Sequence, residues 1–325
     1  MFKNILLISN DVSLTGAPIL LLELAKYLCK KYKVSFWSIF DIPKHCKSLQ
    51  NDFESIGSVK YFHNYKPNNE DIQFAKENYD FIICNTIETA NIAYELNAIL
   101  WYHEMFINNP LLLNNIRIVS LSNKHTKFLK SNGVHNIITS IHGRINSNLK
   151  SKQTGSTKVN VLLIGSFINR KNQLGALDIV RPFKNVHLTM VGSFCSLETG
   201  SDNYYRLVKE NIGDIDCELI DVQPHEKVIE LIDTCDILLC PSLQDTYPVC
   251  VIEALERGKT VLLTEHTCLD LDELLEKPYN SRCCSIDQMS NELNRLLQSK
   301  LYKRPERIKD YDYEERWNNL ITLIK

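Results

Sequence analysis

Two acidic residues, Asp245 and Glu253, lie on either side of the predicted start of a helix. Residues 236–240 form an almost wholly apolar segment, as buried strands of parallel sheets do, and Pro241 ends it. Residues 249–257 then have a helical pattern. Carboxylates accept hydrogen bonds from hydroxyl groups, and the amide groups of the first helical turn favour a phosphate. The arrangement suits a nucleotide-linked polyol; the alternative is an ordinary helix start with a solvated glutamate.

A pair of cations follows another predicted strand, at residues 159–165. After this strand come Ser166 and a short loop with Arg170 and Lys171, and a helix is predicted at residues 173–180. Ligands of open α/β sheets bind at the carboxyl ends of the strands. Because Arg can contact two phosphate oxygens and Lys supplies a point charge, this loop is a candidate diphosphate site. Otherwise the two cations are simply solvated.

In the first half of the chain, Gly16 and His103 also lie after predicted strands. Gly16 lies between a strand predicted at residues 4–9 and a helix at 17–31, where a glycine allows close approach of the backbone to a ligand. His103 follows a strand at 98–102, where its imidazole can donate a hydrogen bond to a sugar hydroxyl or stabilise charge. The residues alone leave a plain turn and a histidine satisfied by the backbone as alternatives.

The composition is that of a soluble globular protein. The chain has 325 residues, enough for two domains, with 44% hydrophobic and 23% charged residues. A formal net charge of -2 gives no reason to expect a nucleic-acid partner. The 11 cysteines include no Cys-x-x-Cys pair, so we expect mostly reduced core residues of a cytoplasmic protein. No apolar run has the length of a membrane span.

Strand and helix patterns alternate along both halves of the chain, which predicts parallel sheets with helices on both faces. We expect two Rossmann-like doubly wound domains, at residues 1–150 and 159–304, that face across a cleft containing the active site. The polar segment 151–158 is the expected linker, and residues 305–325 are an expected C-terminal helix. Further strands are expected at residues 34–39, 59–62, 81–85, 117–121, 136–140, 186–191, 217–220, 260–264 and 282–285.

The segment that begins at Pro241 resembles the GT-B-fold retaining glycosyltransferases of family 4, the group 1 glycosyltransferases. Their signature begins with Pro-Ser, followed by a Glu-Gly-Phe-like turn. Seven residues separate the Glu of this turn from a Glu-Ala pair, and a Gly ends the signature. The matching residues are Pro241, Ser242, Tyr247, Glu253, Ala254 and Gly258. The chain departs from the signature where Asp245 replaces Glu and where Thr246 and Pro248 replace glycines.

The resemblance implies the GT-B fold and transfer of a hexose-type sugar from a nucleotide diphosphate sugar to a hydroxyl acceptor, with retention of configuration. It also implies that the terminal helix crosses back onto the first domain. With cations and a helix terminus to neutralise the diphosphate, no metal or other cofactor is expected. Three Asp-x-Asp sequences, at residues 214–216, 270–272 and 310–312, are therefore expected to be chance occurrences.

The resemblance also implies roles for single residues. Glu253 would bind the ribose hydroxyls, Asp245 would hold the sugar, and His103 would contact the sugar near the reacting carbon. Arg170 and Lys171 would stabilise the departing diphosphate, with Arg170 replacing an arginine that the family has at the position of the serine after the strand. Further donor contacts are implied for Gly16, Ser166, Thr246, Tyr247, Pro248 and Val249.

Several alternatives stay open. The protein is an active transferase, a catalytically inactive nucleotide-sugar-binding scaffold, or a nucleotide-sugar epimerase of the same architecture. The acceptor is a glycan or a lipid-linked sugar. The basic residues that end the helix at 17–31 either complement its dipole or give peripheral contact with the inner face of a membrane. Neither the base nor the sugar of the donor is readable from the residues.

Overall fold

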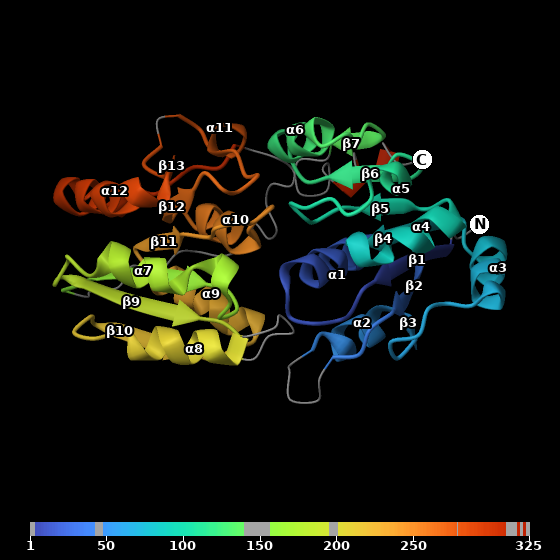
Figure 1. Ribbon diagram of the computed structural model, residues 1–325, viewed down its shortest axis with the longest axis horizontal. Coiled ribbons are helices and arrows are strands. Elements are labelled where there is room, and N and C mark those ends of the chain that lie inside the picture. The colour runs from blue at the N-terminus through green and yellow to red at the C-terminus, as the bar shows by residue number, and fades with distance from the viewer. Residues whose placement is uncertain are drawn as a thin grey trace. The chain divides into compact units, whose positions relative to one another are not determined.

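The computed structural model describes residues 4–42, 48–139, 157–194, 201–277, 279–309, 317–318 and 321–322. The chain divides into two compact units, which Figure 1 shows. Unit 1 comprises Met1–His142 and Glu314–Lys325, and unit 2 comprises Gly143–Tyr313. Of the expected linker, only residues 157 and 158 are among the described residues.

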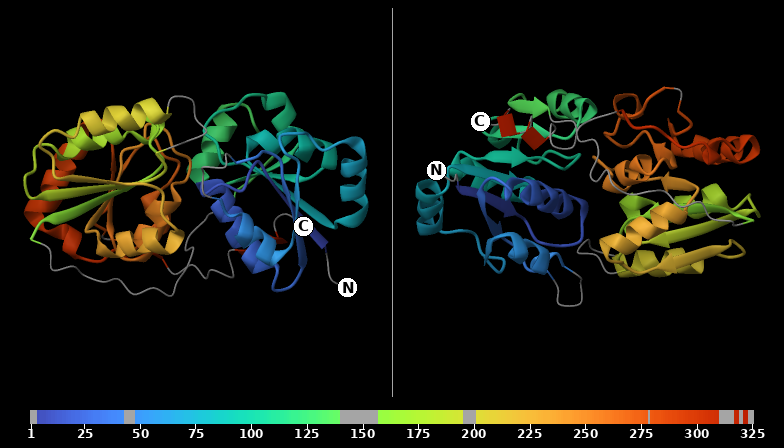
Figure 2. Two further views of the ribbon diagram at one scale, coloured as in Figure 1. Left: turned by 90° about the horizontal axis from the view of Figure 1, so that it is seen from below. Right: turned by 180° about the vertical axis from the view of Figure 1, so that it is seen from behind.

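Unit 1 contains a seven-stranded sheet in the order β3-β2-β1-β4-β5-β6-β7, and every pairing is parallel. The apolar run of β1 is fully buried at Leu6, Leu7 and Ile8, because helices cover both faces of the sheet (Figure 2). The strands are β1 (Asn4–Ser9), β2 (Lys33–Ser38), β3 (Ser58–Tyr61), β4 (Phe81–Asn85), β5 (Ile99–Trp101), β6 (Arg117–Ser120) and β7 (Ile137–Thr139).

The helices of unit 1 connect these strands. Asn68 caps α3 in a capping box with Asp71, which satisfies amide groups at the helix start. The helices are α1 (Gly16–Leu28), α2 (Gln50–Ile56), α3 (Asn69–Asn78), η1 (Ile87–Thr89), α4 (Ala90–Leu96), α5 (Pro110–Leu113) and α6 (Asn123–Ser131).

Unit 2 repeats the plan with a six-stranded parallel sheet in the order β10-β9-β8-β11-β12-β13. In both units the strand order reverses after the first strand, between β1 and β4 and between β8 and β11. The strands are β8 (Val159–Ile164), β9 (Val186–Val191), β10 (Cys217–Ile220), β11 (Ile237–Cys240), β12 (Thr260–Thr264) and β13 (Arg282–Cys284). The helices are η2 (Asn169–Lys171), α7 (Gln173–Val180), α8 (Ser201–Glu210), α9 (His225–Thr234), α10 (Val249–Glu256), α11 (Leu271–Leu274), α12 (Ile286–Ser299) and η3 (Leu301–Lys303).

The predicted fold class, two doubly wound α/β domains, is confirmed. Every predicted strand is present, with its ends within one residue of the expected positions. The first helix ends at Leu28 rather than at residue 31, and α2, α4 and α5 were not predicted. The nine described cysteines are all free, but Cys29 and Cys283 are exposed rather than in the core.

The prediction of a helix from residue 305 onward is wrong for residues 305–309, which are not helical. Ile308 forms an antiparallel bridge with Leu275, and the backbone amide of Glu306 donates to the carbonyl of Gly258 at 2.9 Å. The buried carboxylate of Glu306 accepts hydrogen bonds from the amides of residues 280 and 281, which holds this segment extended on unit 2. In unit 1, Trp317 packs edge-on against Trp101 with ring centroids 6.0 Å apart.

A buried ion pair joins two helices of unit 2. The guanidinium of Arg257, at the end of α10, donates to both carboxylate oxygens of Asp233 in α9, at 2.5 and 2.8 Å. Lys259 donates to the carbonyl of Asp233 at 2.7 Å. The side chains of Arg257 and Asp233 are only 4% and 14% exposed, so removal of one charge leaves the other without a partner away from water.

We therefore expect Arg257→Met to lower the free energy of unfolding by about 3 kcal/mol at pH 7, measured by urea titration. Lys184→Met is the matched control, because the ion pair of Lys184 with Asp214 is largely exposed and contributes little to stability. Equal losses in the two variants would contradict the importance of burial.

Candidate functional site

The loops that follow β8 and β11 meet at the carboxyl edge of the unit 2 sheet, because these two strands are neighbours where the strand order reverses. The amide of Leu243 donates to the carbonyl of Arg170 at 2.8 Å. The side-chain amide of Asn172 donates to the carbonyl of Pro241 at 3.1 Å. These bonds fix the loop after β8, which carries Arg170 and Lys171, against the loop after β11, which carries Asp245.

The two loops bring Lys171 and Asp245 together in an ion pair. Their side chains are 18% and 11% exposed. Burial favours the neutral amine, but the electrostatic interactions with Asp245, Cys240 and Cys250 together outweigh it, so the pKa of Lys171 lies above its ordinary value. The site therefore holds a fixed ammonium group and a fixed carboxylate side by side.

Two glycines make room for this pair. A Cβ atom on Gly165 would meet the aliphatic stem of Lys171 at 3.3 Å, so the stem lies directly over the end of β8. A Cβ atom on Gly192, after β9, would lie 2.0 Å from the carbonyl oxygen of Gly165. Gly192 was not among the predicted site residues, although it directly follows a predicted strand.

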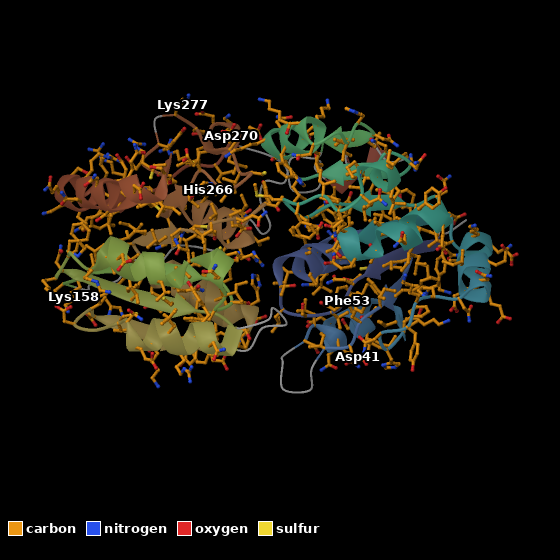
Figure 3. All side chains as sticks on the ribbon, in the orientation of Figure 1. Asp41, Phe53, Lys158, His266, Asp270 and Lys277 are labelled. Atoms are coloured by element: carbon orange, nitrogen blue, oxygen red, sulfur yellow. The ribbon has the colours of Figure 1, made fainter. Side chains whose placement is uncertain are left out.

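The loop after β11 is also hydrogen-bonded to the segment that follows β12. The amide of Asp245 donates to the carbonyl of His266 at 3.1 Å, and the amide of Cys268 donates to the carbonyl of Asp245 at 3.2 Å. Figure 3 labels His266, which follows β12 at the carboxyl edge, and Lys158, which precedes β8 at the opposite edge. Thr246 and Tyr247 are each only 7% exposed, so the loop is part of the packed structure.

Helix α10 begins directly after this loop. Pro248 is its N-cap residue, and no side chain caps the helix. The amide groups of its first turn, which includes Val249, therefore favour an anion at this end. Glu253 lies in the second turn and is 6% exposed.

The carboxylate of Glu253 accepts a hydrogen bond from Nε2 of His225 at 2.5 Å. His225 is the first residue of α9, and its side chain is 43% exposed. His225 was not among the predicted site residues. The available signal was a histidine at a helix start after a strand, Cys217–Ile220, whose carboxyl end faces the same edge of the sheet.

Arg170 and Ser166, the other predicted residues in the loop after β8, have different environments. Arg170 is exposed, and its positive charge acts on Lys171 electrostatically. The carbonyl of Ser166 accepts a hydrogen bond from the buried side-chain amide of Gln173 at 2.9 Å. The structure thus gathers Arg170, Lys171 and Asp245 at one place, with Ser166 in the supporting turn.

Gly16 and His103 lie in unit 1. Gly16 is exposed at the first position of α1, directly after the loop that follows β1, and its φ is not positive. No side chain caps α1, so its first amide groups also favour an anion.

His103 lies just after β5. Burial, with the nearby His125 adding to it, lowers the pKa of His103 to about 3, so its imidazole is neutral at physiological pH. Among the described residues, the buried Nε2 of His103 has no hydrogen-bond partner, and neither does the side-chain amide of Asn85 at the end of β4. Glu104 accepts from the amides of His103 and Ile87, and burial with the charge of Glu88 raises its pKa to about 8.

The described part of the chain contains no group of three or more His, Cys, Asp or Glu side chains that could hold a metal ion. Asp214 and Asp216 form ion pairs with Lys184 and Lys158, and Asp270 caps α11. Residues 310–312 lie outside the described ranges. Within those ranges every helix is too short or too polar to cross a lipid bilayer.

Comparisons with known proteins agree on one fold. A family model described as glycosyl transferases group 1 matches residues 145–315. HepE from Anabaena, solved in complex with UDP and glucose, is similar with a TM-score of 0.75 and 16% identity over 98% of each chain. Sucrose-phosphate synthase from Thermosynechococcus elongatus is similar with a TM-score of 0.73 and 15% identity, over 99% of this chain and 94% of that one.

A third solved structure, the apo form of the lipopolysaccharide outer core galactosyltransferase WaaB, is similar with a TM-score of 0.69 and 15% identity. It matches over 98% of this chain and 99% of that one. No curated protein matches the sequence. At such identities the likeness shows the fold alone, which confirms the predicted GT-B fold class.

We predict that the loss of stability on breaking the Lys171–Asp245 ion pair depends on pH. In Asp245→Asn, burial is no longer opposed by a negative charge, so the folded-state pKa of Lys171 should drop below its ordinary value of 10.5. The variant should lose about 3 kcal/mol of unfolding free energy at pH 7, and the loss should shrink towards pH 10 as the amine loses its proton. Urea titrations at both pH values measure this.

Asp216→Asn is the control for that variant, because Asp216 is half-exposed and pairs with a half-exposed lysine. We expect it to leave stability nearly unchanged at both pH values. A loss in Asp245→Asn that stays constant from pH 7 to pH 10 would show that the charge of Lys171 is not its cause.

Proposed function

Because the chain belongs to the group 1 glycosyltransferases, we propose that it transfers a hexose-type sugar from a nucleotide diphosphate sugar to a hydroxyl acceptor. We further propose a family 4 enzyme that retains the anomeric configuration, as the signature from Pro241 to Gly258 implies.

One observation carries the proposal: the ion pair of Lys171 and Asp245 at the point where the strand order of unit 2 reverses. This is where open parallel sheets bind ligands. A lone buried ammonium group would be costly, and the carboxylate keeps it charged until an anion arrives. The uncapped start of α10 lies directly after the same loop and favours the same anion.

The proposed chemistry follows from these charges. As the bond between the sugar and the diphosphate breaks, negative charge builds up on the phosphate oxygens. Lys171 turns from Asp245 to these oxygens, Arg170 adds a second cation, and the amides of the first turn of α10 donate to them. Asp245, released from the ion pair, then accepts hydrogen bonds from hydroxyl groups of the sugar. The amides of Thr246 and Tyr247 hold the sugar from the same loop.

His103 is proposed to contact the sugar near the reacting carbon. Because its imidazole is neutral, it acts through a hydrogen bond rather than as a cation. The buried Nε2 atom, which lacks a partner among the described residues, is a candidate donor or acceptor for that bond. Gly16, at the start of α1, is proposed to lie near the diphosphate or the acceptor.

We propose a UDP-sugar as the donor, since HepE was solved with UDP-glucose. The proposed acceptor is a glycan or a lipid-linked sugar; WaaB is a lipopolysaccharide galactosyltransferase. Two cations and a helix terminus neutralise a diphosphate, so we propose that transfer needs no metal. We also propose peripheral membrane contact through unit 1, where Lys30 and Lys31 follow α1 and lie over the ring of Tyr27.

A catalytically inactive nucleotide-sugar-binding scaffold is the second candidate. The observation that favours it is the departure from the family signature, in which Asp245 replaces Glu, Ser166 replaces Arg and Pro248 replaces Gly. Such a protein would bind the donor without releasing the nucleotide. Turnover of the donor therefore distinguishes the two functions.

We expect Lys171→Ala and Glu253→Ala each to lower turnover by roughly 10²–10³-fold, because each removes a charged contact to the donor. The assay measures release of UDP from UDP-glucose and UDP-galactose, with water or added glycans as acceptors. Activity should persist in EDTA, and NMR of the first-formed product should show the anomeric configuration of the donor.

The control is Lys184→Ala, which removes an exposed lysine of the same unit and should leave turnover unchanged. Wild-type rates in both site variants would rule out the assignment. Donor binding without any nucleotide release would instead favour the scaffold.

A further inference from the structure

The first residue of α9 is close to the carboxylate proposed to bind the nucleotide ribose. Helix α9 packs against α10, and Nε2 of His225 lies 2.5 Å from Oε1 of Glu253. The Glu253 side chain is 7% exposed and the His225 side chain 43% exposed. The imidazole therefore reaches from the surface to a carboxylate that is nearly buried.

The hydrogen bond leaves most of the carboxylate available. A carboxylate offers about four acceptor positions, and His225 takes one of them. The His225 bond is to Oε1, which leaves Oε2 as the second acceptor atom of the same carboxylate. Two neighbouring ribose hydroxyls can thus donate to the carboxylate while His225 stays in place.

A purely structural role would be to clamp α9 to α10. Arg257 and Asp233 already join the other ends of these helices through two charged hydrogen bonds in a buried place. The His225 bond lies at the end of α9 next to the ligand-binding edge of the sheet, and its imidazole is far more exposed than the Arg257 guanidinium. Its position therefore favours a role in ligand binding.

We propose that His225 is a positioning residue that fixes the carboxylate of Glu253 for the two hydroxyls of a nucleotide ribose. The proposal rests on the proposed function, in which Glu253 binds the donor. A glutamate side chain loses rotational freedom when it binds a ligand, and a hydrogen bond that orders it beforehand reduces this loss. His225 thus increases affinity for ribonucleotides without touching the nucleotide.

The test compares UDP with 2′,3′-dideoxyuridine diphosphate, which lacks both hydroxyls, by isothermal titration calorimetry on the full chain. Wild type should prefer UDP by tenfold or more, about the contribution of hydrogen bonds to a charged group. His225→Ala should weaken UDP about tenfold and leave the dideoxy compound unchanged, so the preference nearly disappears. His225→Gln should retain most of the preference, because its amide can donate from a position similar to that of Nε2. If a guanosine diphosphate is bound instead, the matching guanosine pair replaces these probes.

His187→Ala is the matched control. His187 also pairs with a carboxylate, that of Asp216 at 3.0 Å, but it lies at the start of β9, at the opposite edge of the sheet. Its substitution should leave both affinities unchanged. Equal weakening of both nucleotides in His225→Ala, or no weakening, overturns the inference while the proposed function stands. A wild-type protein that binds no nucleoside diphosphate overturns the proposed function and the inference together.

Discussion

The ion pair of Lys171 and Asp245 is the interaction on which the rest of the candidate site depends. The pair exists because β8 and β11 are hydrogen-bonded neighbours, although Lys171 and Asp245 are 74 residues apart in the chain. The carboxylate of Asp245 raises the pKa of Lys171 and so keeps the ammonium group charged in a place with little access to water. A bound diphosphate can replace the carboxylate as the partner of the ammonium group, so the charge needed for leaving-group stabilisation is already in position.

Glycines in the backbone around the ion pair leave space for the Lys171 side chain. Gly165 leaves space for the stem of Lys171, and Gly192 lets the loop after β9 approach the end of β8. Asp245 is fixed by backbone hydrogen bonds to the segment after β12, and α10 starts at the end of the same loop, at Val249. The loops that follow several neighbouring strands, rather than one loop, therefore determine where the charges of Lys171 and Asp245 lie. A site on such rigid supports requires little reorganisation when a ligand binds.

The central strands were predictable because their apolar runs, such as Leu6 to Ile8, are buried under helices on both faces of the sheet. Lys171, Asp245 and Glu253 could be selected from spacing and charge. The His225–Glu253 bond could not, because it depends on how α9 packs against α10. The expected C-terminal helix is absent at residues 305–309, because tertiary hydrogen bonds of Glu306 outweigh a local periodic pattern there, whereas residues 317–318 and 321–322 are helical. The short helices α2 and α4 carry too little periodicity to be recognised in advance.

The central claim is that the carboxyl edge of unit 2 binds a nucleoside diphosphate through Lys171. A thermal-shift screen with UDP, GDP, ADP, CDP and dTDP, each with and without Mg²⁺, tests it most directly. A ligand at about one hundred times its dissociation constant adds roughly 2.7 kcal/mol of stability, which raises the Tm measurably. We expect one diphosphate to raise the Tm equally with and without Mg²⁺, and Lys171→Met to abolish the shift. No shift with any of the five would contradict it and leave only the fold in common with the glycosyltransferases.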